Sequence, residues 1–193
     1  MVSVNFSNDE NAIDYEVVEI ISDSTQGRIV GKFLKSPILI QGLKDNTPYF
    51  YKVRASNQFG FSEFTELLGS TPSPANSKVL IVNGFDRVTG TTNTFDFILE
   101  HGNAIYINGY SFDGASNEAI INEKIKLNNY EIVDWILGEE GAATSAFDEK
   151  EKALVQDYIL NGGRLLVSGS EIGYDMSEKG NNSDRIFYEN ILK

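Results

Sequence analysis

Cysteine is absent from this sequence of 193 residues. Its absence excludes disulfide bonds, cysteine-ligated metal sites and a catalytic thiolate. Basic side chains are scarce as well, because 16 Lys and Arg residues stand against 28 Asp and Glu residues and give a formal net charge of −12. A surface of this sign repels phosphate backbones and anionic lipids. We therefore expect no nucleic-acid partner, and we expect the negative charge to serve solubility.

Long hydrophobic runs are also missing. No apolar stretch approaches the roughly 20 residues that a membrane-spanning helix requires, so we expect no membrane span. The first residues, MVSVNFSNDEN, contain neither the basic region nor the apolar region of a signal peptide. We interpret the chain as an excerpt of a longer protein, with the signal peptide absent from this fragment.

The residues before position 72 follow the two-residue period of β-strands. Along residues 49–55, aromatic and aliphatic side chains alternate with basic ones, which is typical of a half-buried strand. Residues 13–21 and 37–40 follow the same pattern, and glycines mark the turns between these runs. The pattern predicts an all-β domain over residues 1–72.

The hydrophobic pattern of the sequence changes after a short polar segment at residues 73–77, which we predict to be a linker. Continuous apolar runs then predict buried strands at 78–83, 130–137 and 164–168. The helices expected around these strands cover residues 93–101, 116–125, 148–161 and 184–192. The polar residues 111–118 are expected to form the loop that leads into the helix at 116–125. Alternating strands and helices predict an α/β domain with a parallel sheet over residues 78–193. Because the sheet has few strands, we expect this domain to be C-terminally truncated.

A charged segment that contains glycine follows each of the predicted parallel strands. The candidate site residues in these segments are Asp86, Arg87, Glu139, Glu140, Ser170, Glu171 and Asp175. The three glutamates are the catalytic candidates and the other four are ligand-binding candidates. Ligands of open parallel sheets bind beyond the carboxyl ends of the strands, so we expect all seven at one edge. Neighbouring carboxylates raise one another's pKa, which can create a general acid; the alternative is a set of polar loops without a site.

Other residues are weaker candidates. His101, the only histidine, is expected to end a helix as a solvated or capping residue, and without a nearby histidine Ser170 is a poor nucleophile. Trp135 lies in a buried-strand pattern and is expected in the core. The acidic residues between positions 175 and 184 lack the spacing of a calcium-binding EF-hand. We expect neither a metal ion nor a cofactor.

Residues 43–62, LKDNTPYFYKVRASNQFGFS, resemble the signature of fibronectin type III domains, in which a Leu, a turn and a Tyr precede V-x-A-x-N-x-x-G-x-S. The resemblance covers about residues 3–72 and implies an immunoglobulin-like β-sandwich. It also implies that Tyr49 is the corner tyrosine, with its hydroxyl bonded back to the chain before it. A first strand is missing, and Phe6 stands where the family has a buried Trp. We therefore expect an N-terminally incomplete sandwich.

The spacing Gly169-x-Glu171-x-Gly173 after a buried strand is that of a strand-to-helix elbow. Residues 78–193 resemble class I glutamine amidotransferase-like domains, which implies a flavodoxin-like fold. Those domains have a cysteine nucleophile at the position of Glu171, and their His and Glu partners lie later in the chain. Here no cysteine is present and no histidine follows. The resemblance therefore implies a domain without glutaminase activity.

The order of the two domains, with the segments VNGFDR, SFDGASNEA, DWILGEE and LLVSGSEIGYD, resembles large secreted proteins of Bacteroidetes-type bacteria that are often labelled xanthan lyase or amidase. The residues themselves give no support for lyase chemistry. The resemblance implies a location in the bacterial cell envelope or outside the cell, neighbouring domains in the full-length protein, and polysaccharide or peptidoglycan as a partner.

Three hypotheses about function remain open at this point. We favour a binding or accessory module. The main alternative is a hydrolase or lyase that acts on a glycan or peptidoglycan through clustered carboxylates, and the third is a structural spacer. An open cleft with a suitably spaced carboxyl pair would favour the enzyme, whereas carboxylates bonded to backbone N–H groups would favour a structural role.

Overall fold

In the computed structural model, the described residues are 1–21, 27–88, 92–141 and 144–192. Contacts divide the chain into two compact units, which we call the N-terminal unit (Met1–Asn76 and Ile98–Phe112) and the C-terminal unit (Ser77–Phe97 and Asp113–Lys193). The first break falls within the predicted linker. Residues 98–112, which the sequence placed in the C-terminal domain, belong by their contacts to the N-terminal unit.

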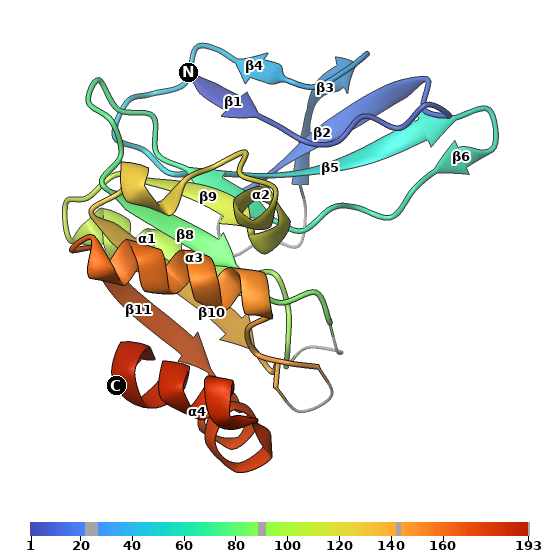
Figure 1. The fold of residues 1–193 in the computed structure, drawn as a ribbon. Coiled ribbons are helices and arrows are strands. Elements are labelled where there is room, and N and C mark those ends of the chain that lie inside the picture. The colour runs from blue at the N-terminus through green and yellow to red at the C-terminus, as the bar shows by residue number, and fades with distance from the viewer. Residues whose placement is uncertain (22–26, 89–91, 142–143, 193) are drawn as a thin grey trace. The chain divides into compact units, whose positions relative to one another are not determined.

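Short antiparallel strands build the N-terminal unit (Figure 1). The strands are β1 (Val2–Val4), β2 (Asp14–Ile20), β3 (Gly27–Phe33), β4 (Ile38–Ile40), β5 (Tyr49–Asn57), β6 (Gly60–Phe61) and β7 (Leu68–Ser70). β1 pairs with β4, while the other strands lie in the order β3-β2-β5-β7 with β6 also on β5. The strands predicted at residues 13–21, 37–40 and 49–55 are confirmed as β2, β4 and β5.

The two sets of strands in this unit share one hydrophobic core. Ile38 of β4 clusters with Val17 of β2 and Val53 of β5, and Val17 is completely buried. Successive side chains of a strand point to opposite faces. The neighbouring positions therefore face away from the core, where Arg54 forms an ion pair with Glu16 (2.5 Å). The unit is thus a β-sandwich whose core takes alternate side chains of β2 and β5.

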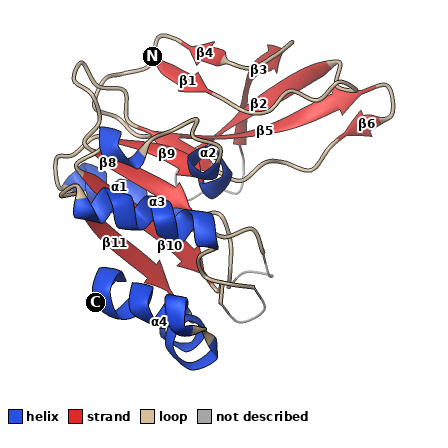
Figure 2. Ribbon diagram, viewed as in Figure 1, coloured by secondary structure: helices blue, strands red, loops and turns tan. Residues whose placement is uncertain are grey.

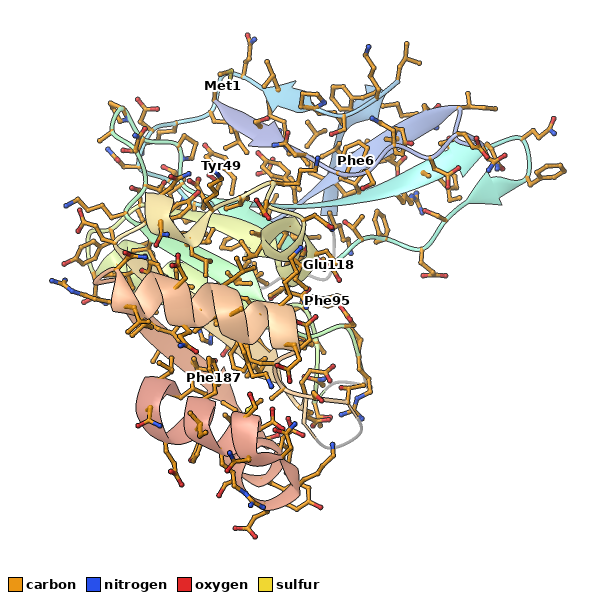
Figure 3. The ribbon with its side chains drawn as sticks, in the orientation of Figure 1. Met1, Phe6, Tyr49, Phe95, Glu118 and Phe187 are labelled. Atoms are coloured by element: carbon orange, nitrogen blue, oxygen red, sulfur yellow. The ribbon has the colours of Figure 1, made fainter. Side chains whose placement is uncertain are left out.

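Two aromatic side chains fix the corners of this sandwich (Figure 3). The Tyr49 hydroxyl accepts a hydrogen bond from the backbone N–H of Lys44 (2.9 Å), so the predicted bond to the preceding chain is confirmed. Phe6 is half-buried and its ring packs on Tyr15, with the ring centroids 4.7 Å apart. Phe6 therefore contributes to the core from the segment that follows β1.

Tyr49→Phe is expected to lower the free energy of unfolding of the N-terminal unit by about 1 kcal/mol, because the Lys44 N–H loses its acceptor while the ring keeps its packing. Urea denaturation of the two proteins measures the difference. Tyr106→Phe is the matched control, since Tyr106 is 40% exposed. This substitution is expected to lower the free energy of unfolding by a smaller amount. Equal effects of the two substitutions would contradict a specific role for the Tyr49 hydroxyl.

The N-terminal unit also contains most of helix α1 (Phe97–Ile107). The helix begins later than the predicted position 93, because Thr94 makes a turn in which its carbonyl accepts from the Phe97 N–H (3.4 Å). A Cβ atom on Gly102 would lie 2.6 Å from the Phe112 ring and 3.0 Å from the Phe50 ring. Only glycine at this position lets the helix backbone approach the two rings.

The C-terminal unit alternates strands and helices (Figure 2). Its strands are β8 (Val79–Asn83), β9 (Phe112–Ser116, of which Asp113 onward belongs here), β10 (Ile132–Gly138) and β11 (Arg164–Gly169). Its helical segments are α2 (Asn117–Ile121), η1 (Leu127–Asn129), α3 (Glu149–Leu160), η2 (Tyr174–Lys179), α4 (Asn182–Phe187) and η3 (Tyr188–Leu192). None of the helices within the described ranges has both the length and the apolar character needed to cross a membrane.

The strands of this unit lie in the order β9-β8-β10-β11, and β8, β10 and β11 are parallel. The three predicted strands and their parallel arrangement are therefore confirmed, and β8 and β10 are buried as predicted. The predicted burial of β11 is wrong, because β11 lies at the edge of the sheet and Leu166 is 57% exposed. β9 corrects the sequence analysis, which interpreted residues 111–118 as a loop. Residues 112–116 form a strand, in which Phe112 and Ala115 are buried although their neighbours are polar, and residues 117 and 118 begin α2.

Helix α3 begins and ends at the predicted signals. The Asp148 side chain accepts from the Glu151 N–H (2.7 Å) and the Glu151 side chain accepts from the Asp148 N–H (2.7 Å), which is a capping box. At the other end, Gly162 has φ +90° and the Gly163 N–H donates to the Tyr158 carbonyl (2.9 Å). This Schellman-type ending turns the chain directly into β11.

Candidate functional site

Three loops follow the carboxyl ends of the parallel strands, at residues 84–87, 138–141 and 169–175. We call them together the strand-end edge. All seven candidate residues lie at this edge, as the topology predicts, and Asp175 is already part of the helical segment η2. The contacts between the loops decide which side chains remain available for chemistry.

The first two loops are tied together by buried polar contacts. The Arg87 N–H donates to a Glu140 carboxylate oxygen (3.4 Å), and the Arg87 guanidinium donates to the Glu139 carbonyl (2.8 Å). Asn93, which is completely buried, donates to the Arg87 carbonyl (2.6 Å) and accepts from the Glu139 N–H (3.2 Å). Sequence analysis did not identify Asn93, because its partners are distant in the chain and no local pattern marks it.

The second and third loops are in direct contact. The Ser170 N–H donates to the Gly138 carbonyl (2.9 Å). Gly141 has φ +104°, and a Cβ atom there would lie 2.9 Å from Cβ of Asp175 and 3.2 Å from Cβ of Glu171. Glu171 therefore lies against the loop that carries Glu140. Glycine at position 141 is needed for this close approach, since another residue would be strained and crowded.

Two of the candidate carboxylates are buried and hold the loops in place. Asp175 accepts from the Ala146 N–H (2.7 Å) and from the Lys179 ammonium group (3.1 Å). Glu140, which is 5% exposed, accepts from the Thr144 hydroxyl in addition to the Arg87 N–H. Both side chains therefore join neighbouring segments of the strand-end edge and have a structural role there.

Glu171 differs from these two residues. It is half-buried in a bend between β11 and the helical residues that begin at position 172, and its carbonyl accepts from the Asp175 N–H (2.9 Å). Within the described ranges its carboxylate makes no hydrogen bond or ion pair. The described non-glycine residues with positive φ are Asn46 and Glu123, so Glu171 lacks the strained backbone of a nucleophile elbow.

A second group of carboxylates lies beside the first loop. Partial burial, a hydrogen bond with the Glu118 carboxyl group and the charges of Glu118 and Glu140 raise the pKa of Asp86. Glu118 is exposed and extends from the first turn of α2 (Figure 3). Sequence analysis did not connect Glu118 with Asp86, because it did not predict strand β9, which brings α2 beside the end of β8.

Glu151 lies behind this group on helix α3. Burial raises its pKa, and the charges of Asp148 and Asp86 add to that effect, although hydrogen bonds from the Asp148 backbone and the Asn117 amide oppose it. The Asn117 amide donates to Glu151 (2.9 Å). Glu151 is therefore a capping residue whose carboxylate is already bonded on both sides.

The described residues contain no group of three or more His, Asp or Glu side chains placed to hold a metal ion. Asp175 and Asp184 accept from different lysines, Lys179 and Lys152. His101 lies in α1, within the N-terminal unit. Trp135 is completely buried in the C-terminal unit, which confirms the prediction that it belongs to the core.

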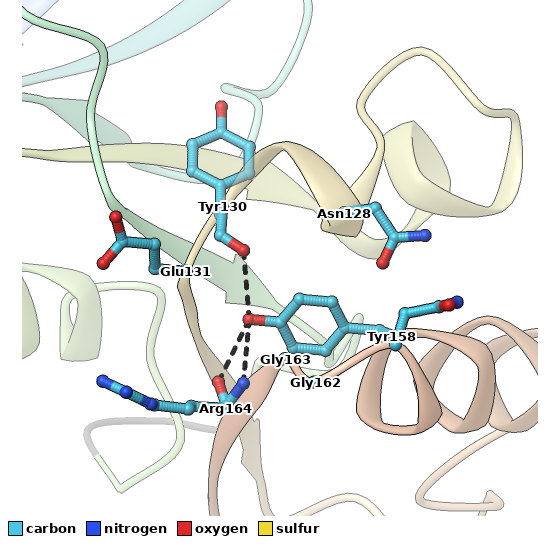
Figure 4. Close-up of a pocket in the computed structure, with 8 residues that line it drawn as sticks. Asn128, Tyr130, Glu131, Tyr158, Gly162, Gly163 and Arg164 are labelled. Carbon is cyan, nitrogen blue, oxygen red and sulfur yellow. Dashed lines mark hydrogen bonds between the residues drawn. The ribbon is translucent and has the colours of Figure 1, made fainter.

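A pocket lies at the opposite ends of the same strands. It has a volume of about 260 Å³, and its walls come from η1, the start of β10, the end of α3 and the glycine turn before β11 (Figure 4). Sequence analysis did not predict it, because it interpreted Gly162 and Gly163 only as the end of a helix.

Glu140→Ala is expected to lower the free energy of unfolding of the C-terminal unit by about 1–2 kcal/mol, because it removes a buried side chain and leaves the half-buried Arg87 N–H without its acceptor. Glu171→Gln is the matched control and is expected to change this free energy by no more than about 0.5 kcal/mol. Chemical denaturation measures both. A loss for Glu171→Gln as large as that for Glu140→Ala would show that Glu171 also holds the loops together.

No protein-family model matches the chain, and no curated protein matches it. Among solved structures, the chain is similar to the twitchin kinase region from C. elegans, with 18% sequence identity and a TM-score of 0.29. The match covers 34% of this chain and 12% of that chain.

Proposed function

We propose that this chain is a binding or accessory region of a larger cell-surface protein and has no glutaminase activity. The observation that carries the proposal is the state of Glu140 and Asp175. Both are buried at the strand-end edge and accept hydrogen bonds from backbone N–H groups of neighbouring loops. These bonds hold the two side chains in fixed positions between neighbouring segments, which suits a scaffold better than an acid–base pair.

The N-terminal unit is, in this proposal, a fibronectin type III-like spacer. Its support is the antiparallel sandwich together with the hydrogen bond between the Tyr49 hydroxyl and the Lys44 N–H. The C-terminal unit is an amidotransferase-like domain in which Glu171 replaces the nucleophile. Its support is the parallel order of β8, β10 and β11 and the position of Glu171 directly after β11.

The proposed partners are polysaccharide or peptidoglycan in the bacterial envelope. Co-sedimentation of the whole chain with insoluble peptidoglycan and with insoluble polysaccharides tests this proposal. We expect the chain to sediment with at least one of these polymers and to release no soluble fragments from it. A chain that stays in the supernatant with every polymer overturns the proposed partners, and release of fragments overturns the non-catalytic role.

The second candidate function is hydrolysis or lysis of such a polymer, and the raised pKa of Asp86 favours it. A raised pKa makes a carboxyl group easier to protonate, which suits a general acid, and Glu139, Glu140 and Glu171 lie in the neighbouring loops. Release of reducing ends or unsaturated products by the native chain, and its loss in Asp86→Asn, would establish this function. Release that persists in Asp86→Asn would exclude Asp86 as the acid.

A further inference from the structure

The polar pocket lies at the amino ends of β10 and β11, whereas the strand-end edge lies at their carboxyl ends. Its position makes it independent of the carboxylates at the strand-end edge. The residues around it come from four successive elements of the C-terminal unit (Figure 4). The pocket is therefore a second place on this unit where a ligand can be held.

The floor of the pocket is preformed. Tyr158 is 1% exposed, and its hydroxyl accepts from the Arg164 N–H (3.2 Å). The same hydroxyl lies within donating distance of the Arg164 carbonyl (3.2 Å) and the Tyr130 carbonyl (3.3 Å). A Cβ atom on Gly163 would lie 2.3 Å from the Tyr158 ring, so only glycine leaves room for the ring. When the shape of a pocket is fixed before binding, the protein loses little conformational entropy when a ligand enters.

The rim of the pocket presents two oriented amide groups. Asp157 accepts a hydrogen bond from the Asn128 amide (3.1 Å) and another from the Asn161 amide (3.1 Å). In the described part of the chain, the two amide oxygens make no hydrogen bond. Because Asp157 fixes the amide nitrogens, these oxygens are available to accept hydrogen bonds from a ligand.

The charges around the pocket balance. Glu131 forms an ion pair with Lys78 (2.9 Å) in which both side chains are 59% exposed, and Arg164 also lines the pocket. The rim thus offers amide and carboxylate acceptors together with guanidinium donors. Such a mixture matches a neutral ligand with several hydroxyl groups, because each hydroxyl donates one hydrogen bond and accepts others.

We propose that this pocket binds a neutral sugar unit of a glycan, with the Asn128 and Asn161 amides as its hydrogen-bond partners. The inference rests on the proposed function, since it names where the polymer is held. The volume of about 260 Å³ is near the lower limit for small-molecule pockets, which limits the ligand to one or two sugar rings. The buried Tyr158 ring offers no face for stacking, so affinity is expected to be in the millimolar range.

Amide chemical-shift mapping of the whole chain with maltose, cellobiose and diacetylchitobiose tests the proposal. We expect one of these probes to shift residues 127–131 and 158–164. The double variant Asn128→Ala/Asn161→Ala is expected to bind that probe about tenfold more weakly, which is the size of losing one or two neutral hydrogen bonds. The matched control is Asn190→Ala, an exposed helical asparagine outside the pocket, and it is expected to bind as the native chain does.

Shifts confined to residues 84–87, 138–141 and 169–175 would overturn the proposal, and so would unchanged binding by a double variant with a native melting temperature. A native chain that sediments with a polymer but shows no pocket shift with any probe overturns this inference and leaves the proposed function standing. A native chain that neither sediments nor responds to a probe overturns both.

Discussion

Trp135→Ala is expected to lower the free energy of unfolding of the C-terminal unit by about 3–5 kcal/mol, the usual loss when a large buried aromatic side chain is removed. Trp135 is completely buried in the middle of β10, and its ring centroid lies 5.3 Å from that of Phe147. Denaturant melts, combined with amide hydrogen exchange of β8 and β10, measure the loss in this unit. A change below about 1 kcal/mol would contradict the packing of this core.

Trp135→Phe is the informative control. In the described part of the chain the Trp135 indole N–H has no hydrogen-bond partner, so replacing it with phenylalanine leaves no acceptor unsatisfied. Trp135→Phe is therefore expected to lower the free energy of unfolding by only about 1 kcal/mol. A Cβ atom on Gly84 would lie 2.0 Å from the indole nitrogen. Gly84→Ala is therefore expected to be much less harmful in Trp135→Phe than in the native chain. Strictly additive losses in this double-mutant cycle would contradict the contact.

Asp184→Asn is expected to lower the free energy of unfolding of the C-terminal unit by about 2–3 kcal/mol, because it breaks an ion pair with a buried lysine. Lys152 is 7% exposed and Asp184 is 17% exposed. Glu149 also accepts from Lys152 (2.7 Å) but is 76% exposed. It therefore compensates only in part for the loss of the Lys152–Asp184 ion pair. The matched control is Glu131→Gln in the exposed Lys78–Glu131 pair, for which the expected loss is below about 0.5 kcal/mol.

The contribution of Asp184 depends on pH. Burial opposes its ionisation, but hydrogen bonds from Lys152 and Asn181 and the charge of Lys152 outweigh burial and hold the pKa of Asp184 below its usual range. The ionised carboxylate therefore stabilises the fold above the unfolded pKa of about 3.9, and this contribution is lost as the pH falls through the folded pKa. Thermal melts between neutral pH and pH about 3 measure this effect. The melting temperatures of the native chain and of Asp184→Asn should converge below pH about 4. A stability difference between the native chain and Asp184→Asn that stays constant in acid would exclude this ion pair as its source.

Local signals in the sequence predicted much of the C-terminal unit. The apolar runs predicted β8 and β10, because strands buried on both faces leave little room for polar residues. The apolar run also located β11, although β11 is an edge strand with exposed positions. Asp148 and Glu151 marked the start of α3, and Gly162 marked its end. These features depend on residues within one turn of one another, so a single sequence contains the information.

Features that depend on distant partners were not predictable in the same way. β9 is polar apart from Phe112 and Ala115, so its pattern resembles a loop until it pairs beside β8. The seven candidate residues were predicted to share one edge, but the bonds that occupy Glu140 and Asp175 involve loops far away in the chain. The pocket at Tyr158 depends on Asn128 and Arg164, which no local pattern links.

The late position of α1 in the chain affects how the protein is synthesised. A ribosome releases Met1–Asn76 and then residues 77–97 of the other unit before Ile98–Phe112, which complete the N-terminal unit. Until then Phe50 lacks the Phe112 ring, whose centroid lies 6.0 Å away in the folded unit. The nascent chain thus lacks this cover over the Phe50 side chain while strand β8 of the second unit emerges, and during that interval a chaperone can bind there.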